Sequence, residues 1–257
     1  MLNLEHIDKT FYRGTVNETP IFTDFNLTVE KDQFISVIGS NGSGKSTLLN
    51  IICGSLPIDN GCLLLNDQDI TKMKDFKRSE FIARVYQDPA KGSCASFSIL
   101  ENMALADNKG KPFLFKKAVN KDRIDFYRTQ LEKLHLGLEN RIHDNVGNLS
   151  GGQRQALAMI TATLTPNKIL ILDEHTAALD PKTSEIIMEL TNEIVTEKKL
   201  TTIMVTHNLK FAISYGNRIL MMHQGECIID KCGDEKNNLA LSEILDKFNE
   251  ISIETGN

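Results

Sequence analysis

The stretch GSNGSGKSTLLN, residues 39–50, decides the fold of this chain. It starts at the last residue of the apolar run FISVIG and leads into KSTLLNIIC, which has the pattern of a helix. Gly39, Gly44, Lys45 and Ser46 fill the pattern G-x-x-x-x-G-K-[ST] in the strand–loop–helix setting that this pattern requires. The sequence therefore predicts a loop that holds the phosphate groups of a nucleotide.

The residue types of this loop suit phosphate groups. Glycines allow successive backbone N–H groups to point inward, and the start of a helix adds partial positive charge. Lys45 would reach the β- and γ-phosphates, and the Ser46 hydroxyl would bind Mg²⁺. A Gly- and Ser-rich turn without a ligand is the alternative, but a chance match is expected in only about 1 in 100 such chains. The residues that we expect at the nucleotide are Gly39, Ser40, Asn41, Gly42, Ser43, Gly44, Lys45, Ser46 and Thr47.

The composition is that of a globular chain, with 257 residues of which 41% are hydrophobic and 25% charged. The net charge of −5 gives no electrostatic reason to bind nucleic acid, and we expect no nucleic-acid partner. Five scattered cysteines without a C-x-x-C pair favour reduced thiols over a metal site. No run reaches the roughly 18 to 20 apolar residues that span a bilayer, and the N-terminus lacks the features of a signal peptide. We therefore expect a cytosolic protein unless a partner holds it at a membrane.

In the first two thirds of the chain, the apolar pattern distinguishes a strand-rich part from a helical part that follows it. Residues 2–11 and 21–29 alternate apolar and polar side chains, as half-buried antiparallel strands do, and residues 61–70 predict a further strand and turn. The continuous run at residues 34–39 predicts a strand buried on both faces. Strand-like runs then disappear from about residue 88 to 165. In that region KDRIDFYRTQLEKLHLGL has apolar residues at helical spacing, and QRQALAMITATL predicts a second helix.

Parallel-sheet patterns return after the helical region. KILILDE and TTIMVTH are short apolar runs with the helix-like SEIIMELTNEIVTEKK between them, which predicts a βαβ crossover. NRILMMHQGECIID predicts two closing strands with a turn at Gln224 and Gly225, and LALSEILDKFNEI predicts a terminal amphipathic helix. The prediction is an α/β fold: a P-loop NTPase core with a mostly parallel sheet, an N-terminal antiparallel β subdomain and an inserted helical subdomain.

We expect a single domain over residues 1–250. Its RecA-like core would occupy about residues 1–87 and 166–235, the helical subdomain about residues 88–165, and the C-terminal helix about residues 239–250.

Acidic residues end the apolar run ILILDE. In an open parallel sheet, ligands bind beyond the carboxyl ends of the strands, where the phosphate loop also lies. Asp173 would hold Mg²⁺ through its water shell, and Glu174 would polarise an attacking water. A helix or turn cap is the alternative for such an Asp-Glu pair. His207 ends the run TTIMVTH, where a γ-phosphate contact competes with a packed or capping histidine.

A second glycine-rich stretch, NLSGGQRQALAM, covers residues 148–159. Ser150, Gly151 and Gly152 precede a predicted helix and would form a separate anion-binding helix start. A good N-cap with flexible glycines is the alternative, although LSGGQ should arise by chance in only about one in several thousand chains of this size. One nucleotide does not need two such loops. We therefore infer that two copies pair head to tail and that each lends its second loop to the other's nucleotide.

Taken together, these motifs resemble the ATPase subunit of ATP-binding cassette (ABC) transporters, over roughly residues 2–230. GSNGSGKST resembles the Walker A loop, ILILDE the Walker B strand and LSGGQ the ABC signature, in the family's order. Gln87, in VYQDPAKGS, lies where the family has its Q-loop glutamine. AALD, ending at Asp180, resembles the D-loop, and His207 resembles the switch histidine.

The resemblance implies ATP and Mg²⁺ as cofactors and a dimer that closes on ATP and opens after hydrolysis. It assigns catalysis to Glu174 as base, Lys45 as charge stabiliser, His207 as γ-phosphate sensor, and Gln87. It assigns Mg²⁺ to Ser46, Gln87 and Asp173, and further nucleotide contacts to Ser150, Gly151, Gly152, Gln153 and Asp180. Phe11 or Tyr12 would stack on adenine; the family pattern favours Phe11, and both stay open.

A subgroup of import-type ATPases shares the sequence motifs QDP-A-x-G and LDEHTAALDP. The resemblance therefore implies a second ATPase subunit, most simply an identical copy, a transmembrane permease and an extracytoplasmic binding protein. The ATPase would lie at the cytoplasmic face of the cell membrane as a peripheral protein. Import of a small, amino-acid-like molecule is the function that this subgroup suggests.

Two features do not follow from the motifs. His175 stands where most family members carry proline, and we interpret it as a tolerated loop variant. The basic stretch at residues 109–123 is interpreted as a solvated face, with a contact to anionic lipid or to the membrane partner as the alternative.

Other functions of the family fit the sequence less well. Chromosome-structuring relatives carry long coiled coils between Walker A and signature, and ribosome-acting relatives usually carry two cassettes. This chain has about a hundred intervening residues without sustained heptads, and one cassette. A nucleotide-gated module without catalysis would lack the base or the lysine, whereas Lys45, Asp173 and Glu174 are all present.

Overall fold

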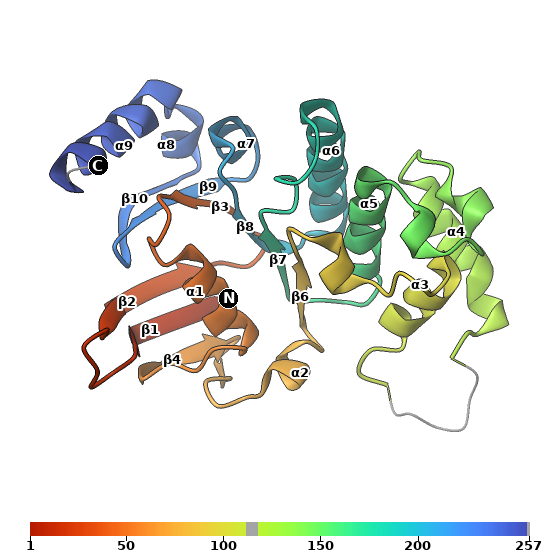
Figure 1. Ribbon diagram of the computed structural model, residues 1–257, viewed down its shortest axis with the longest axis horizontal. Coiled ribbons are helices and arrows are strands. Elements are labelled where there is room, and N and C mark those ends of the chain that lie inside the picture. Colours follow the sequence, from red (N-terminus) through yellow and green to blue (C-terminus); the bar gives the residue numbers. More distant parts are fainter. Residues whose placement is uncertain (112–117, 256–257) are drawn as a thin grey trace. The chain divides into compact units, whose positions relative to one another are not determined.

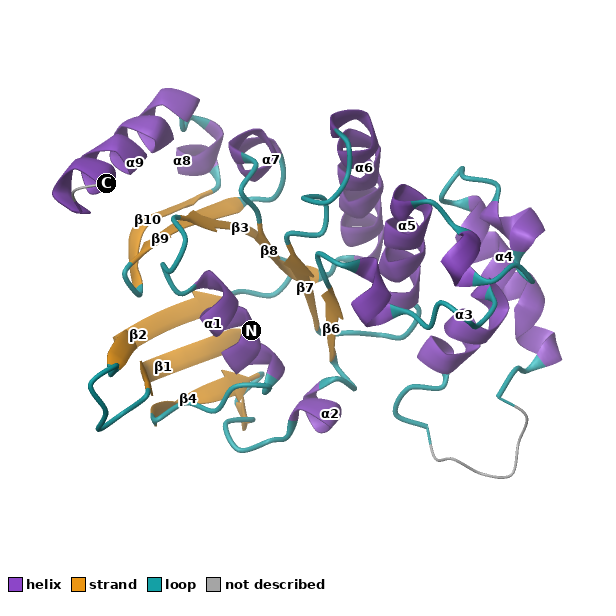
Figure 2. Cartoon of the chain, viewed as in Figure 1, coloured by secondary structure: helices purple, strands orange, loops and turns teal. Residues whose placement is uncertain are grey.

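The computed structural model describes residues 1–111 and 118–255 and divides them into two compact units. The first unit joins Met1–Ser79 to the chain from Lys199 onward, and the second is Glu80–Lys198. Figures 1 and 2 show the elements of each unit. Residues 112–117, which belong to the basic stretch singled out above, lie outside the described residues, as do residues 256–257.

The N-terminal part of the first unit is an antiparallel sheet. Its strands lie in the order β2 (Thr19–Val29), β1 (Leu2–Phe11), β4 (Asn60–Leu65) and β5 (Gln68–Asp69). Leu2, Leu4 and Ile7 of β1 are buried, and the polar residues between them are partly or fully exposed. This one-sided burial confirms the antiparallel strands predicted from the alternating pattern.

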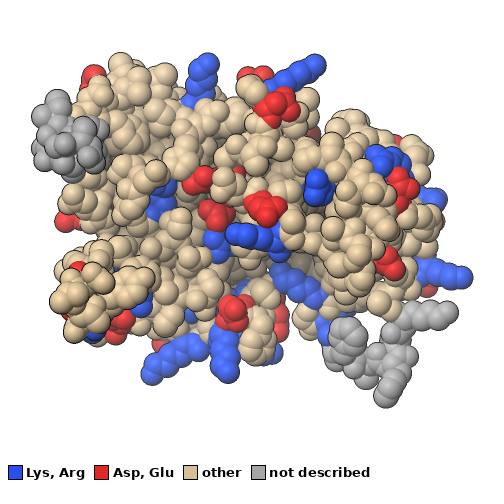
Figure 3. Space-filling model, in the orientation of Figure 1, with Lys and Arg blue, Asp and Glu red and all other residues tan. Residues whose placement is uncertain are grey.

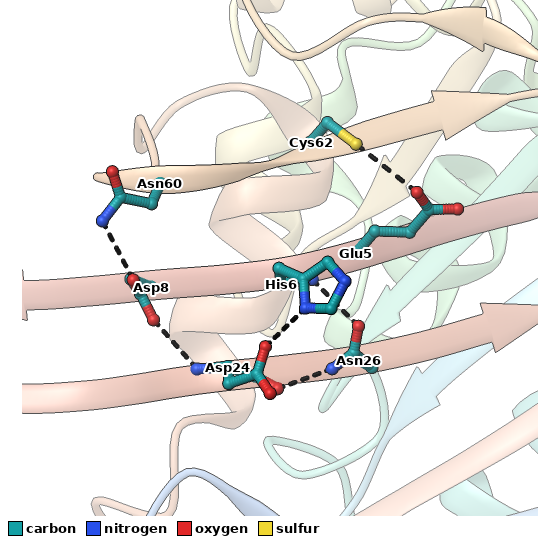
Figure 4. A network of polar contacts seen from close by, with 7 residues as sticks. All are labelled: Glu5, His6, Asp8, Asp24, Asn26, Asn60 and Cys62. Carbon is teal, nitrogen blue, oxygen red and sulfur yellow. Dashed lines mark hydrogen bonds and ion pairs between the residues drawn. The ribbon is translucent and has the colours of Figure 1, made fainter.

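Polar side chains bridge the irregular stretch of this sheet, where the β1–β2 register shifts between Leu4 and Lys9 (Figure 4). The backbone N–H of His6 donates to Asn26 Oδ1 at 2.9 Å, and that of Asp24 donates to Asp8 Oδ1 at 2.9 Å. His6 and Asp24 both have positive φ, 52° and 53°. A β-bulge interrupts the ladder of backbone hydrogen bonds, so these side chains supply acceptors to backbone donors at the interruption.

The rest of the first unit is a mainly parallel sheet. Its strands lie in the order β10 (Glu226–Cys232), β9 (Arg218–His223), β3 (Phe34–Gly39) and β8 (Thr201–Val205), with β3 parallel to both β8 and β9 and β10 antiparallel to β9. Every residue of β3 is buried, as its continuous apolar run predicts. The turn between β9 and β10 has positive φ at Gln224 and Gly225, as expected for a two-residue hairpin.

Helices cover this sheet. Helices α1 (Lys45–Cys53) and α7 (Leu209–Ser214) contact β3, α8 (Asp234–Asn237) contacts β10, and α9 (Leu241–Thr255) contacts α7. A core cluster lies beneath α7 and α9; its buried members are Ile38, Ala212, Ile219, Met221, Leu239 and Ile244. Helix α9 confirms the predicted C-terminal helix as an element, with a start at Leu241.

A buried arginine closes the far end of α1. Arg78, at the end of α2 (Asp75–Arg78), donates from Nη1 to the carbonyls of Ile51 at 2.7 Å and Ile52 at 3.0 Å. The last carbonyls of a helix have no partner within the helix and carry partial negative charge. The guanidinium satisfies two of them and stabilises the helix that follows the phosphate loop.

In its described residues, 80–111 and 118–198, the second unit holds two parallel strands and four main helices. The strands β6 (Ile82–Val85) and β7 (Ile169–Asp173) pair in parallel, and α5 (Gly151–Ala162) packs against α3 (Ile99–Asp107), α4 (Ile124–Glu132) and α6 (Pro181–Lys198). The connections that the structure describes include the 3₁₀ turns Pro89–Gly92, Lys121–Arg123, Leu138–Arg141 and Val146–Asn148. Strand β6 is absent from the strands predicted above, because it has only four residues and a charge at Arg84 interrupts its apolar pattern.

Helix α4 is shorter than its apolar spacing predicts. The helix ends at Glu132, His135 has a φ of 51°, and Gly137 has a φ of 71°. Leu134 and Leu138 are nevertheless buried. Side chains at helical spacing can therefore reach the same core after the backbone has left the helix, and the spacing alone could not show where the helix ends.

A buried carboxylate joins α3 to α4. Asp107, 6% exposed at the end of α3, accepts hydrogen bonds from Arg123 Nε at 2.9 Å, Arg123 Nη2 at 3.0 Å and the Tyr127 hydroxyl at 2.9 Å. Burial alone would raise the pKa of Asp107. The hydrogen bonds from Arg123 and Tyr127 and the charge of Arg123 nevertheless hold that pKa below its ordinary value.

These sheets and helices confirm the predicted α/β class, whereas the residue boundaries of the predicted subdomains stay a prediction. Basic and acidic side chains are interspersed on the face shown in Figure 3, in keeping with 29 Lys and Arg against 34 Asp and Glu. Among the described residues, no helix is both long and apolar enough to cross a lipid bilayer.

Candidate nucleotide site

The phosphate loop has backbone geometry that only glycine fits at two positions. Gly39 has a φ of 149°, and a Cβ there would lie 2.2 Å from the Met222 carbonyl oxygen. Gly44, the N-cap of α1, has a φ of 102°, and a Cβ there would lie 3.0 Å from the Phe22 ring. The loop therefore turns tightly against β9 and β2 into the helix, which explains the glycines at both ends of the motif.

The lysine of the motif is held inside its own loop. Lys45 is 6% exposed, and its Nζ donates to the carbonyls of Gly39 at 2.9 Å and Ser40 at 2.8 Å, with Ser43 Oγ at 3.4 Å. The next residue, Ser46, is exposed in the first turn of α1. The loop thus presents a fixed cation and a hydroxyl at a helix N-terminus, which is the donor set that a phosphate chain requires.

His207 lies beside the phosphate loop, at the same edge of the parallel sheet. It follows β8, which pairs in parallel with β3, so the two strands end at one edge of the sheet. One cavity of 360 Å³ is lined by Ile38, Gly39, Ser40, Asn41, Thr206, His207, Leu209, Leu245 and Phe248. The structure therefore brings together His207 and the first residues of the loop, as a γ-phosphate contact would require.

The two candidates for adenine stacking differ in exposure. Phe11 ends β1, is half-buried and has the Lys9 ammonium 5.7 Å from its ring centroid. Tyr12 is 69% exposed, and its ring centroid lies 6.3 Å from that of Phe11. Either ring could stack on a base, so the choice between them stays open.

The acidic pair lies in the second unit, where β7 ends. Asp173 is the last residue of that strand, and Glu174 follows with a φ of 49°. Asp173 Oδ2 accepts from Arg84 Nη2 at 2.6 Å, and the Arg84 guanidinium lies 4.9 Å from the centroid of the Tyr86 ring. Arg84 is not among the residues that the sequence motifs predict. The available signal was its position as the single charge within the run FIARVY.

The predicted Q-loop glutamine leaves strand β6. Gln87 is exposed two residues beyond the last strand residue, Val85. Gln155, buried in α5, donates from Nε2 to the carbonyl of Tyr86 at 3.1 Å. The backbone just before Gln87 is therefore tied to the helix that the signature begins.

The signature builds the start of α5. Ser150 is the N-cap, with its Oγ accepting from the Gln153 N–H at 3.3 Å and its own N–H donating to Gln153 Oε1 at 3.1 Å. This is a capping box, and it accounts for two of the five signature residues. Gly151 and Gly152 lie inside the first helical turn, where the sequence predicted that they precede it.

Asp180 occupies the equivalent position before α6. Its Oδ1 accepts from the Thr183 N–H at 3.1 Å, and Pro181 is the first helical residue. Hydrogen bonds from the Thr183 side chain and backbone lower the pKa of Asp180. The residue assigned to the D-loop therefore also caps the start of α6.

His175, interpreted above as a tolerated loop variant, is buried in the loop after Glu174. It is 2% exposed, and its Nε2 lies 3.1 Å from the hydroxyl of Thr191 in α6. Burial lowers the pKa of His175 to about 4.

The donor groups fit ATP and Mg²⁺. The residues expected at the metal offer oxygen atoms only, from the Ser46 hydroxyl, the Gln87 amide and the Asp173 carboxylate, and Mg²⁺ prefers oxygen ligands. In the part of the chain that the structure describes, no three His, Cys, Asp or Glu side chains come together that could hold a metal ion by themselves. These oxygen ligands suit a Mg²⁺ ion whose other ligands are phosphate oxygens of the nucleotide.

Comparisons with known proteins agree with this chemistry. A profile of the ABC transporter family matches residues 22–177. The chain is 45% identical to the tyrosine transport ATP-binding protein of Clostridioides difficile (strain R20291) over 248 residues, which cover 96% of this chain and 98% of that protein. It is 31% identical to the methionine import ATP-binding protein MetN of Vibrio vulnificus (strain YJ016) over 231 residues, 89% of this chain and 64% of that protein.

A solved structure of an ATP-binding cassette is similar to this chain as well. A dimeric ATP-binding cassette in a post-hydrolysis state, bound to ADP and Pi, matches with a TM-score of 0.76 at 28% identity. The match covers 90% of this chain and 98% of that one.

Proposed function

The chain belongs to the ABC transporter family as an ATP-hydrolysing subunit, and we propose that its ATPase cycle drives the import of a small, amino-acid-like molecule through a membrane permease. The proposal rests on the phosphate loop, in which Lys45 is buried and whose residues Gly39, Ser40 and Asn41 line one cavity with His207. One relative transports tyrosine and another imports methionine, which supports an amino-acid-like cargo.

The proposed assembly contains two identical copies of this chain, a transmembrane permease and an extracytoplasmic binding protein. The ATPase subunits lie at the cytoplasmic face of the membrane. The dimeric cassette bound to ADP and Pi supports a second copy. Each copy would present its signature residues Ser150, Gly151, Gly152 and Gln153, and Asp180, to the nucleotide of the other.

In the proposed reaction, the loop grips the phosphate chain. The N–H groups at the start of α1 and the Lys45 ammonium would bind the β- and γ-phosphates, together with the loop residues Ser40, Asn41, Gly42, Ser43 and Thr47. His207 would contact the γ-phosphate, and Phe11 or Tyr12 would stack on adenine. The Lys45 ammonium is held by carbonyls of its loop before the ligand arrives, so little reorganisation of this cation is needed when charge develops on the phosphate oxygens.

Glu174 is the proposed base. Its carboxylate would accept a proton from water as the water oxygen bonds to the γ-phosphorus. The bond from that phosphorus to the β–γ bridging oxygen breaks, and ADP and phosphate leave. Ser46, Asp173 and Gln87 would hold Mg²⁺. When bound, Mg²⁺ supplies positive charge that offsets the charge on the phosphate oxygens.

Co-purification from solubilised membranes tests the transporter function. Affinity-tagged full-length chain should recover a multi-span membrane protein in stoichiometric amount from detergent-solubilised membranes of its own host. Proteoliposomes with that complex should accumulate a radiolabelled amino acid only when ATP is supplied on the side of the ATPase. Recovery of ribosomes or nucleic acid without any membrane protein would overturn the proposal.

A further inference from the structure

The residue after the proposed base is fastened to a helix. His175 is buried, and its Nε2 lies 3.1 Å from Thr191 Oγ1, in the middle of α6. Thr191 is fully buried as well, and its hydroxyl donates to the carbonyl of Ile187 at 2.7 Å. A hydroxyl has one hydrogen to donate, so Thr191 Oγ1 must accept from the imidazole. His175 is therefore the tautomer with the proton on Nε2.

A neutral imidazole fits this environment. One imidazole N–H donor meets one hydroxyl acceptor, Thr191 Oγ1. Thr176, the next residue, is also buried, and its carbonyl accepts from Ser184 Oγ at 3.1 Å. Two consecutive residues after Glu174 thus dock on the same helix.

The backbone of Glu174 needs such support. Its φ of 49° lies in the left-handed region, which residues other than glycine adopt at a cost in free energy. Such a conformation persists only where the flanking structure determines it. On one side Glu174 follows strand β7, which is paired with β6, and on the other side it precedes the anchored His175.

We propose that His175 is a positioning residue, which fixes the backbone from which the Glu174 carboxylate projects by anchoring it to Thr191 in α6. The inference rests on the proposed role of Glu174 as base. His175 itself exchanges no proton in the reaction. Its effect is on the placement of the base, and small displacements of a catalytic group lower the rate more than they lower substrate binding.

Four variants test the anchor. Thr191→Val removes the acceptor with little change of shape, and His175→Ala removes the donor. His175→Gln keeps an N–H donor at similar reach, and Thr191→Ser keeps the hydroxyl. Thr196→Val is the matched control, because Thr196 is exposed on the same helix. For each variant, kcat per ATP-binding site, the dissociation constant of a fluorescent ATP analogue and the melting temperature are measured on the full-length chain.

The anchor predicts a split between turnover and binding. Thr191→Val and His175→Ala should each lower kcat by about 10- to 100-fold, with nucleotide affinity within about twofold of wild type. The double variant should be no slower than the worse single variant, because both remove one interaction. His175→Gln and Thr191→Ser should recover most of the turnover, and the control should match wild type.

Two results would overturn the anchor. Wild-type kcat in Thr191→Val would do so even if His175→Ala failed to fold. A lower melting temperature with unchanged kcat per binding site would show a structural role alone. Glu174→Gln is measured in the same series. If that variant is inactive while Thr191→Val is fully active, the anchor fails and the base assignment stands; if Glu174→Gln is active, the base assignment itself fails.

Discussion

At the scale of single residues, two charges carry the chemistry that the motifs predict. Lys45 is held by carbonyls of its own loop, so its ammonium is in position before a nucleotide binds. Glu174 follows the end of β7 with a φ of 49°, a conformation that costs free energy. In the proposed reaction, Lys45 would bind phosphate in the ground state, and Glu174 would act only as the water attacks.

The two roles predict different effects for substitutions at Glu174 and at Lys45. Glu174→Gln keeps the shape of the side chain and removes the base, so ATP turnover should fall by at least about 100-fold while ATP still binds. Lys45→Ala removes the buried cation, so nucleotide affinity should fall by at least about tenfold. Steady-state hydrolysis and equilibrium binding of a fluorescent ATP analogue measure the two effects. Turnover at the parent rate in Glu174→Gln, or unchanged affinity in Lys45→Ala, would contradict the respective role.

Sequence could predict these residues because their spacing along the chain is itself the motif. Gly39, Lys45 and Ser46 lie within eight positions, and one strand–loop–helix unit brings them together. Arg84 and Asp173 are 89 positions apart, as are other pairs joined only by the fold. Nothing in the order of residues pairs an arginine of one strand with an aspartate of its neighbour. The anchor of His175 on Thr191 was hidden for the same reason.

At the scale of elements, the contact between α3 and α4 depends on one carboxylate. Asp107→Asn removes the charge that both Arg123 and Tyr127 contact, and it leaves the arginine without its carboxylate. We expect a loss of about 2 kcal/mol in the free energy of unfolding at pH 7. Urea unfolding followed by circular dichroism measures it. Asp122→Asn, at an exposed position nearby, is the matched control and should change stability little.

The difference in stability between wild type and Asp107→Asn should depend on pH. Because the pKa of Asp107 is lowered in the folded chain, its contribution is complete above the ordinary aspartate pKa near 3.8 and is lost as the pH falls through the lowered value. The stability difference between wild type and Asp107→Asn should therefore stay constant from pH 7 to about 5 and shrink below about 4. A difference that grew on acidification would show that the folded carboxyl holds its proton more tightly than an unfolded one.

Elements were predicted well where the pattern is continuous or strictly alternating, as in β3 and β1. They were predicted poorly where tertiary packing sets the boundary. Helix α4 ends although buried leucines continue its spacing, and β6 is too short and too polar to be seen as a strand. Local propensity does not record such limits, because they depend on what the element packs against.

At the scale of the whole molecule, the proposed head-to-tail pairing can be tested by mixing two inactive chains. Lys45→Ala disables the phosphate loop. Gly151→Asp disables the signature, since the new carboxylate would repel a triphosphate. The fold should tolerate it, because a Cβ at Gly151 would lie 3.6 Å from Leu179, an ordinary van der Waals distance, and an acidic residue suits a helix start.

If each nucleotide contacts the loop of one copy and the signature of the other, a mixed dimer has one intact site and one doubly defective site. Equal mixing of the two inactive chains should then restore ATP turnover, to about a quarter of the wild-type rate for a two-fold symmetric dimer with independent sites. Each chain alone, at the same total concentration, is the control. No recovery on mixing would mean that the two loops of a single copy act on the same nucleotide.

One small contact has a mechanical meaning. The Tyr86 carbonyl next to Gln87 is bonded to Gln155, five residues beyond the serine that opens α5, which is about 7.5 Å along a helix axis. A helix is stiff over that distance. A displacement of the chain at residue 86 must therefore either move the start of α5 or break that hydrogen bond. In this way α5 couples the position of residue 86 to the position of the signature serine.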